Sequence, residues 1–156
     1  AIVLAGSSGQ ALAFGPGHVE LTPDAGERGV AVYSAHRDTH FRFLKDVAIG
    51  DEIVITRGDG KLFRFRADSD SVVRFEAPGI DPLSGGTELV LSTCWPFDAV
   101  TPGPMRYLLH ATLIEDSAAP PTNIGERDQA IAVTSWTGGA IAPSNPQDPR
   151  GIGRLP

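Results

Sequence analysis

Apolar and polar residues alternate along much of this chain with a period of two, which is typical of β-strands. The alternation is clearest at residues 61–67, where two phenylalanines face one side and two arginines face the other, as in a half-buried strand. An Asp-Gly turn signal at residues 59–60 joins this segment to an apolar one at residues 52–56 and predicts a hairpin. The pattern predicts further strands at residues 2–5, 29–36, 71–75, 88–93 and 106–114.

Helical periodicity is scarce in this chain. Residues 39–47 have apolar residues at a helix-like spacing, at Phe43, Leu44 and Val47. Residues 95–105 contain three prolines, so we expect them to form a loop. Many short strands separated by glycine and proline turns predict a mainly β fold, a sandwich or a closed barrel, with one or two short helices.

The distribution of charge divides the chain near residue 116. Sixteen of the 19 acidic and ten of the 13 basic residues lie in residues 1–116, which therefore carry the whole net charge of −6. Residues 117–156 have no net charge and hold six prolines and five glycines. We expect one β-rich domain over residues 1–116 and a poorly ordered, Pro/Gly-rich C-terminal tail over residues 117–156, with one short strand at residues 130–136.

The composition argues against several classes of protein. A net charge of −6 and an isoelectric point of about 5.1 disfavour a general electrostatic binder of nucleic acid. No apolar run approaches the roughly 20 residues that a membrane-spanning helix needs. Cys94 is the one cysteine of the sequence, which excludes an intrachain disulfide and a multi-cysteine zinc knuckle. A lone cysteine is either a small buried apolar residue or a nucleophile.

Three residues at predicted strand ends are candidates for chemistry. Cys94 follows a predicted strand and precedes the proline-containing loop, a position that suits a nucleophile. His36 also ends a strand and is the best base to favour the thiolate. Arg106 opens an apolar strand and could stabilise an oxyanion as a fixed cation. A buried cysteine, a capping histidine and a surface arginine remain the structural alternatives for these positions.

The other histidines and one short motif carry less weight. His36 and His40 have the spacing of a helical zinc pair, but the glutamate of the metalloprotease motif is missing and Arg37 disfavours a cation, so no metal is expected. His18 is expected in a loop and His110 in a packed strand. The hairpin turn explains an Arg-Gly-Asp triplet at residues 57–59 better than adhesive binding does.

These candidates stand in motifs that resemble those of sortases. Leu-Ser-Thr-Cys at residues 91–94 resembles the family's Thr-x-Thr-Cys signature, with serine at the first threonine position. Arg106 follows twelve residues after the cysteine, at the start of the next strand, as in sortases. Ala-His-Arg-Asp at residues 35–38 resembles the Gly-His-Arg segment, and Gly-Asp at residues 50–51 resembles the strand opening that follows it. The similarity covers about residues 2–116.

Two further segments, residues 12–18 and residues 94–98, are most similar to the proteobacterial branch of the family. The resemblance implies a sortase-like closed β-barrel. Sortases carry an N-terminal membrane anchor and a first strand before the segment with which this chain begins. We therefore expect a truncated chain whose barrel lacks its first strand and has an unpaired edge. The implied location is the cell envelope, membrane-anchored with the catalytic domain extracytoplasmic, and periplasmic in a Gram-negative cell.

The resemblance also implies a cysteine transpeptidase. Cys94 would attack the backbone carbonyl of a C-terminal sorting signal in an exported protein. His36 would protonate the departing amine and later take a proton from the incoming amine acyl acceptor. Arg106 would hold the substrate backbone and the oxyanion. The implied enzyme is a monomer with no cofactor, metal or nucleic-acid partner.

The remaining site candidates come from the segments around Cys94 and His36. Asp38 and Asp98 are candidates for orienting His36. The expected substrate-binding residues are Ser92, Thr93, Trp95, Phe97 and Met105, whereas core packing is the better interpretation of Tyr107. Two alternatives remain open. One is a non-catalytic peptide-binding β-barrel with an inert cysteine. The other is an L,D-transpeptidase, although that family places His-Gly before its cysteine and this chain has Ser-Thr there.

Overall fold

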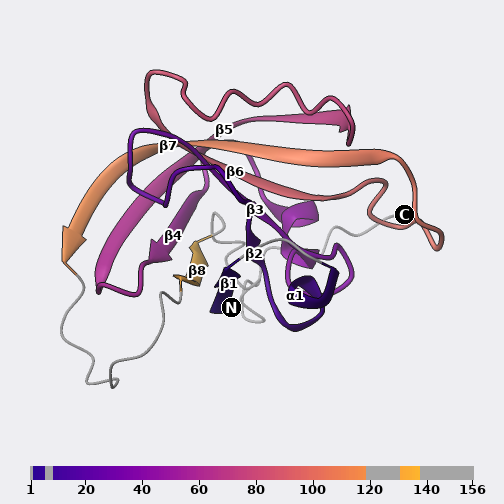
Figure 1. Ribbon diagram of the computed structural model, residues 1–156, viewed down its shortest axis with the longest axis horizontal. Helices are drawn as coiled ribbons and strands as arrows, with labels where there is room; N and C mark the ends of the chain where they lie inside the picture. Colours follow the sequence, from indigo (N-terminus) through magenta and orange to yellow (C-terminus); the bar gives the residue numbers. More distant parts are fainter. Residues whose placement is uncertain (1, 6–8, 119–130, 138–156) are drawn as a thin grey trace, which may run out of the picture.

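The computed structural model describes residues 2–5, 9–118 and 131–137, with side chains for residues 12–114 (Figure 1). This part of the chain is mainly β, as the alternation predicts. Its strands are β1 (Ile2–Ala5), β2 (Gly17–His18), β3 (Gly29–Ser34), β4 (Glu52–Thr56), β5 (Lys61–Arg74), β6 (Thr87–Cys94), β7 (Met105–Ala118) and β8 (Ile131–Thr137). Its helices are the short α1 (Gly9–Phe14) and the 3-10 helix η1 (Arg42–Asp46), which lies within the predicted helical segment.

The strands close into a barrel in the order β1-β2-β3-β6-β7-β5-β4-β8, with β8 paired to β1. Strands β3 and β6 run parallel, and β7 lies antiparallel to β6 and to β5. Strands β5 and β7 are the longest and run side by side in Figure 1. The predicted closed barrel is therefore confirmed, and β3, β6 and β7 form three adjacent strands of it.

The expected unpaired barrel edge is wrong for the described strands. Strand β8 pairs antiparallel with both β1 and β4, so it fills the position at which an open edge was expected. It coincides closely with the short strand predicted at residues 130–136, inside the segment expected to be a tail. The barrel closes because a strand from beyond residue 116 provides the strand pairing that was expected to be absent. The extent of the tail stays a prediction.

The hairpin between β4 and β5 forms as the turn signal predicts. The Arg57 N–H donates to the Lys61 carbonyl at 2.9 Å, and Gly60 has a φ of +81°, which glycine adopts without strain. Two predicted strands, residues 61–67 and 71–75, merge into the single β5, whose register shifts between Ala67 and Ser69. A bulge of this kind lets one strand change its alternation without ending.

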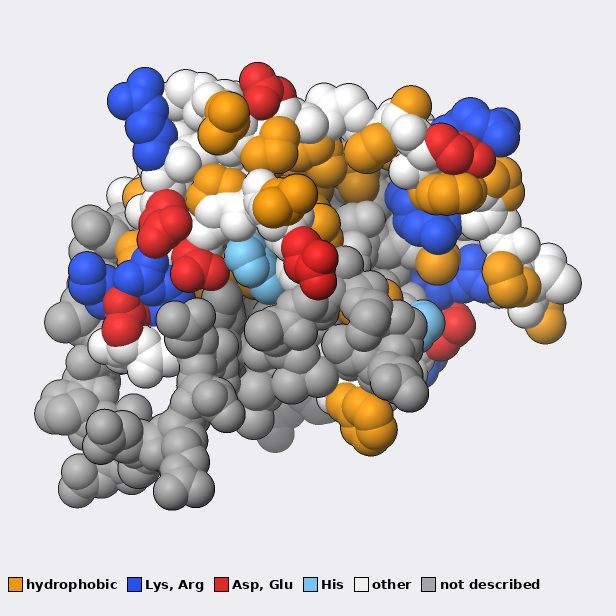
Figure 2. Space-filling view, viewed as in Figure 1, with side chains coloured by type: hydrophobic (Ala, Val, Ile, Leu, Met, Phe, Trp, Pro, Cys, Tyr) orange, Lys and Arg blue, Asp and Glu red, His pale blue; other side chains and the backbone are white. Residues whose placement is uncertain are grey.

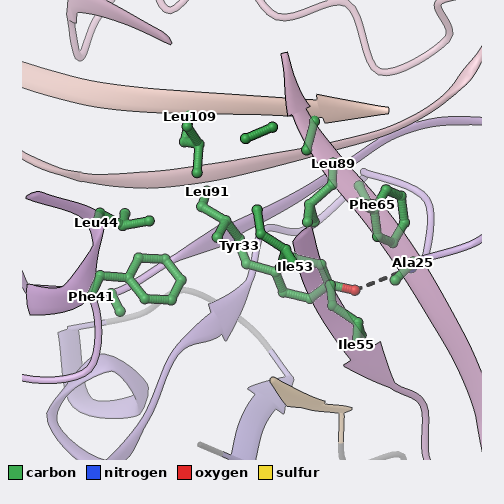
Figure 3. Close-up of a cluster of buried hydrophobic side chains, with 14 of the residues drawn as sticks. Ala25, Tyr33, Phe41, Leu44, Ile53, Ile55, Phe65, Leu89, Leu91 and Leu109 are labelled. Atoms are coloured by element: carbon green, nitrogen blue, oxygen red, sulfur yellow. Dashed lines mark hydrogen bonds between the residues drawn. The ribbon is translucent and has the colours of Figure 1, made fainter. Parts of the chain in front are cut away.

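The barrel interior holds the main hydrophobic core. Figure 3 shows its side chains converging from β3, β4, β5, β6 and β7. Tyr33 at its centre is fully buried, and its hydroxyl accepts a hydrogen bond of 3.1 Å from the Ala25 N–H. Burial raises the pKa of Tyr33 well above its ordinary value. The fully buried side chains over which this core is built include Phe41, Leu44, Ile53, Ile55, Phe65, Leu89, Leu91 and Leu109.

A second, smaller core lies on the outer face of the three adjacent strands. Val30, Val32, Val90 and Leu108 form it, and side chains from β5 and from the loops before β3 and before β6 pack against it. Both faces of β3 and β6 are therefore buried, which fixes the register of these strands. Figure 2 shows other apolar side chains exposed among charged ones on the described surface.

Candidate active site

Cys94 and Arg106 lie opposite each other at one end of the β6–β7 ladder. The register pairs Cys94 with Arg106 and Ser92 with Leu108. Paired residues in an antiparallel ladder project to the same face of the sheet. The half-buried thiol of Cys94 and the half-buried guanidinium of Arg106 therefore share one surface. Cys94 and Arg106 are twelve residues apart in the sequence. They become cross-strand partners because the proline-rich segment between them is a loop that reverses the direction of the chain.

His36 reaches the same end of the sheet from β3. The parallel register pairs Ser34 with Ser92, so the chain leaves β3 beside the last residues of β6. The Ala35 N–H donates to the Ser92 carbonyl at 3.2 Å, and the Thr93 hydroxyl donates to the Ala35 carbonyl at 2.8 Å. The His36 side chain is exposed. The three predicted residues thus gather at the ends of three adjacent strands.

Arg37, directly after His36, is a buried residue whose role the sequence did not reveal. It is 7% exposed. Its Nη1 donates to the Pro96 carbonyl at 2.9 Å, and its Nη2 donates to the Ala99 carbonyl and, at 3.4 Å, to the Thr101 carbonyl. All three acceptors belong to the loop between β6 and β7. In the sequence, only the position of Arg37 next to His36 indicates that it could matter. That position does not predict its contacts with the loop between β6 and β7.

Arg106 is held by two backbone carbonyls just before it in the chain and by one aromatic ring. Its Nη1 donates to the Gly103 carbonyl at 3.0 Å and to the Met105 carbonyl at 2.9 Å. Its guanidinium carbon lies 5.5 Å from the centre of the Phe75 ring, within cation–π range. The Phe75 N–H also donates to the Pro104 carbonyl at 2.9 Å. Phe75 is a second residue that sequence reasoning missed, because its apolar character predicted no more than the end of a strand.

A pocket of about 580 Å³ opens beside Arg106, and neither Cys94 nor His36 is among the residues that line it. It reaches Ser92 and Arg106, the same-face neighbour of Cys94 and its cross-strand partner. The strand residues that line it are Val32, Ser34, Ser92, Arg106 and Leu108, and loop residues that border it include Val19, Leu21, Phe75, Ile80 and Pro82. Its wall is mostly apolar, and its polar residues are Ser34, Ser92 and Arg106 on the strands and Glu20 and Thr22 in the loop before β3.

Residues 1–114 match the family model of the sortase domain. The chain belongs to the sortase family. Sortase D of Bacillus subtilis (strain 168) is 30% identical to it over 109 residues, which make up 69% of this chain and 54% of that protein. The chain therefore spans about half the length of this curated relative.

Solved sortase structures resemble the barrel. Listeria monocytogenes sortase A superposes with a TM-score of 0.66 at 20% identity, over 76% of this chain and 81% of that one, and this likeness concerns the fold alone. Streptococcus agalactiae sortase C1, solved as a complex with MTSET, has a TM-score of 0.63 at 27% identity, over 79% of this chain and 63% of that one. The similarity to the proteobacterial branch stays a prediction.

The residues expected to bind substrate divide between two faces of this sortase. Ser92 lines the pocket. The Thr93 side chain is 2% exposed and points toward the β3 end, where it holds Ala35. Trp95 and Phe97 pack on Tyr107 with ring centres 6.0 Å and 5.0 Å away, against the main core. The expected core packing of Tyr107 is confirmed.

Met105 is half-buried, and its carbonyl accepts a hydrogen bond of 3.1 Å from the Trp95 N–H. This bond closes the base of the loop between β6 and β7. Thr93, Trp95, Phe97 and Met105 are not among the residues that line the pocket, and their substrate contacts stay predictions.

The two candidate orienting aspartates are both exposed in this sortase. Asp38 Oδ1 lies 3.6 Å from Arg37 Nε, and its side chain is 73% exposed, so its nearest ionic partner is Arg37. Asp98 lies in the loop after Cys94. Orientation of His36 by either carboxylate stays a prediction.

The other histidines of this sortase have structural neighbours. His18 lies in β2 and not in a loop as expected, and its Nε2 lies 2.9 Å from the Pro23 carbonyl and 3.0 Å from the Thr22 hydroxyl. His110 Nε2 lies 3.4 Å from the Ser71 hydroxyl. Within residues 12–114, no three His, Cys, Asp or Glu side chains gather as metal ligands. The described part of the chain contains no helix long and apolar enough to cross a membrane.

Proposed function

We propose that this sortase is a cysteine transpeptidase that cleaves a C-terminal sorting signal and transfers the acyl group to an amine. One observation carries the proposal. Cys94 and Arg106 are cross-strand partners, and His36 leaves the parallel neighbour strand at the same end. Sortases as a family act in sorting proteins to the cell wall, which supports the same reaction class. A nucleophile, a proton carrier and a fixed cation are the groups that acyl transfer needs.

The reaction follows from these three groups. The Cys94 sulfur, as a thiolate, forms a bond to the carbonyl carbon of the sorting signal, and Arg106 stabilises the negative charge that develops on the oxygen. The carbon–nitrogen bond then breaks as His36 gives a proton to the departing amine, which leaves a thioester on Cys94. An incoming amine attacks the thioester, His36 takes its proton, and the sulfur leaves as the thiolate. Attack by water instead would release a free acid.

The pocket indicates the kind of substrate. Its strand floor is apolar up to Ser92 and Arg106, so an apolar side chain of the signal would lie on Val32 and Leu108 while its backbone carbonyl approaches Cys94. We propose that the substrate is the sorting signal of an exported protein and that the enzyme works extracytoplasmically at the cell envelope, attached to the membrane. The acceptor is an amine of the envelope.

A peptide-library assay tests this proposal. We expect the enzyme to convert a subset of peptides to hydroxamates when hydroxylamine is the amine acceptor, measured by mass spectrometry. Cys94→Ala removes the nucleophile and should abolish the product. Arg106→Ala should lower kcat/KM by about 100-fold to 1,000-fold, the usual loss on removing an oxyanion donor.

Leu83→Ala is the matched control, because Leu83 is 85% exposed in a loop. It should keep the activity of the unmodified enzyme. Product formation by Cys94→Ala at the original rate would end the transpeptidase proposal. Saturable peptide binding with no product from any variant would favour a non-catalytic peptide-binding barrel.

A further inference from the structure

The residues before and after His36 both form hydrogen bonds with the chain next to Cys94. Ala35 bonds to residues before the cysteine, and Arg37 bonds to a residue after it. Before His36, Ala35 exchanges hydrogen bonds with Ser92 and Thr93. After His36, Arg37 donates to the carbonyl of Pro96. The histidine therefore lies between two anchors, one on the strand before the cysteine and one on the loop after it. The first anchor combines one backbone hydrogen bond with the bond from the Thr93 hydroxyl, whereas the second depends on the Arg37 side chain.

Arg37 is an unusual residue for this position. A guanidinium is rarely buried without a carboxylate partner of comparable burial. Here Asp38 is largely exposed, and Arg37 Nε has no hydrogen-bond acceptor among the described residues. The buried charge is compensated mainly by three backbone carbonyls of the loop, at Pro96, Ala99 and Thr101. A neutral side chain at this position would avoid the cost of removing a charge from water. The positions of the three carbonyls therefore explain the arginine better than its charge does.

That geometry is a fork that only arginine provides. One terminal nitrogen of Arg37 binds the Pro96 carbonyl. The other binds the carbonyls of Ala99 and Thr101, which follow Pro96 by three and five residues. A lysine ammonium is a single point charge and cannot hold acceptors this far apart in one fixed plane. The fork thus sets the path of the loop that begins directly after Cys94, relative to the turn that begins directly after His36.

We infer that Arg37 is a positioning residue that fixes His36 relative to Cys94. The inference rests on the proposed function, because it assigns a part in the same reaction. Arg37 touches neither reacting atom and acts through the two segments that it joins. Displacement of reacting groups by about 1 Å can lower a rate by about 100-fold, so a clamp on both segments has a direct kinetic consequence.

A double-mutant cycle on thiol reactivity tests the inference without a known substrate. The probe is MTSET, which forms a mixed disulfide with the Cys94 sulfur and releases a sulfinate. In the unmodified protein, His36→Ala should slow this reaction about tenfold, because it removes the proposed proton carrier of the thiol. In an Arg37→Gln background the same His36→Ala change should slow it by less than about twofold, because the two groups are no longer held together. Arg37→Lys should give an intermediate ratio.

One further measurement, hydrogen exchange, and one control variant accompany the cycle. Hydrogen exchange of the amides in residues 95–104 should speed up in Arg37→Gln and in Arg37→Lys. Arg66→Lys is the control, since Arg66 is an exposed arginine on β5 that lies 3.5 Å from Glu52. It should leave both the His36 ratio and the loop exchange unchanged. If Arg37→Gln does not fold, Arg37→Lys decides the inference by itself.

The outcomes distinguish the two proposals. An unchanged His36→Ala ratio in both folded Arg37 variants would overturn the positioning role and leave the transpeptidase proposal standing. A His36→Ala change that has no effect in the unmodified protein would overturn the activated thiol pair, and the positioning role with it. A lowered melting temperature with an unchanged ratio would show that Arg37 only stabilises the fold.

Discussion

At the scale of single residues, the candidate site is supported by side chains that do no chemistry themselves. Arg106 is oriented by the carbonyls of Gly103 and Met105 and by the Phe75 ring. The sequence predicted Cys94, His36 and Arg106 as candidates, because each combines a reactive group with a strand end. It could not predict Phe75, because the contact of that ring with Arg106 depends on tertiary structure.

Phe75 provides a prediction at this scale. Phe75→Ala removes the ring from Arg106 and opens the wall of the pocket. The lost cation–π contact is worth about 0.5–1 kcal/mol at an exposed site, so kcat/KM should fall about two- to fivefold in the peptide assay. Phe75→Trp keeps an aromatic face and should retain most of the activity. Equal losses for the alanine and tryptophan variants would contradict the role assigned to the ring.

At the scale of elements, the alternation of apolar and polar residues predicts where most strands lie. The irregularities, such as the bulge in β5, depend on contacts with other strands, which that alternation does not show. The β4–β5 hairpin was predictable from Asp-Gly. The Arg-Gly-Asp triplet in its turn is bound internally, since Arg57 donates to Asp59, lies 3.8 Å from Glu27 and lies over the Phe63 ring. Strand β5 passes through its bulge as one element, because β7 pairs with it on both sides of the register shift. That partner cannot be read from local sequence.

The hairpin turn yields a pH prediction. The hydrogen bond from Arg57 is the main reason why the pKa of Asp59 lies below its ordinary value. A carboxyl with a lowered pKa contributes stability above its unfolded-state pKa of about 3.9, and this stability is lost as the pH falls through the folded-state pKa. Asp59→Asn should therefore be less stable than the original protein at neutral pH, and the difference should shrink below about pH 4.

Urea midpoints measured across this pH range would check the prediction. Asp59→Glu is the control, because it keeps a carboxylate next to Arg57. A difference between Asp59→Asn and the original protein that stays constant from neutral to acidic pH would show that the ionised carboxylate does not contribute to stability.

At the scale of the whole molecule, the barrel is closed by chain from beyond the predicted domain. Alternation and the sortase motifs predicted a barrel over residues 1–116, and composition indicated a tail after it. A short strand was predicted at residues 130–136, but composition gave no reason to expect that this strand pairs with the barrel. Strand β8 lies between β1 and β4, and its pairing with both strands makes it part of the barrel.

Removal of β8 tests its contribution. A chain that ends at Ala118 keeps the predicted domain but leaves β1 and β4 each with one open edge. We expect its melting temperature to fall by more than about 4 °C, which corresponds to a loss of at least about 1 kcal/mol in a domain of this size. Differential scanning calorimetry on both chains measures the change. Equal melting temperatures would show that the barrel is stable without β8.

The parallel pairing of β3 with β6 has a consequence for how the site assembles during folding. Thr93 bonds to a carbonyl 58 residues away, whereas Cys94 and Arg106 belong to neighbouring strands joined by a short loop. Closing the longer segment costs more chain entropy, and contacts of this kind tend to form late. The thiol and the cation can therefore come together before the histidine arrives, so a partly folded chain would carry a cysteine without its proton carrier.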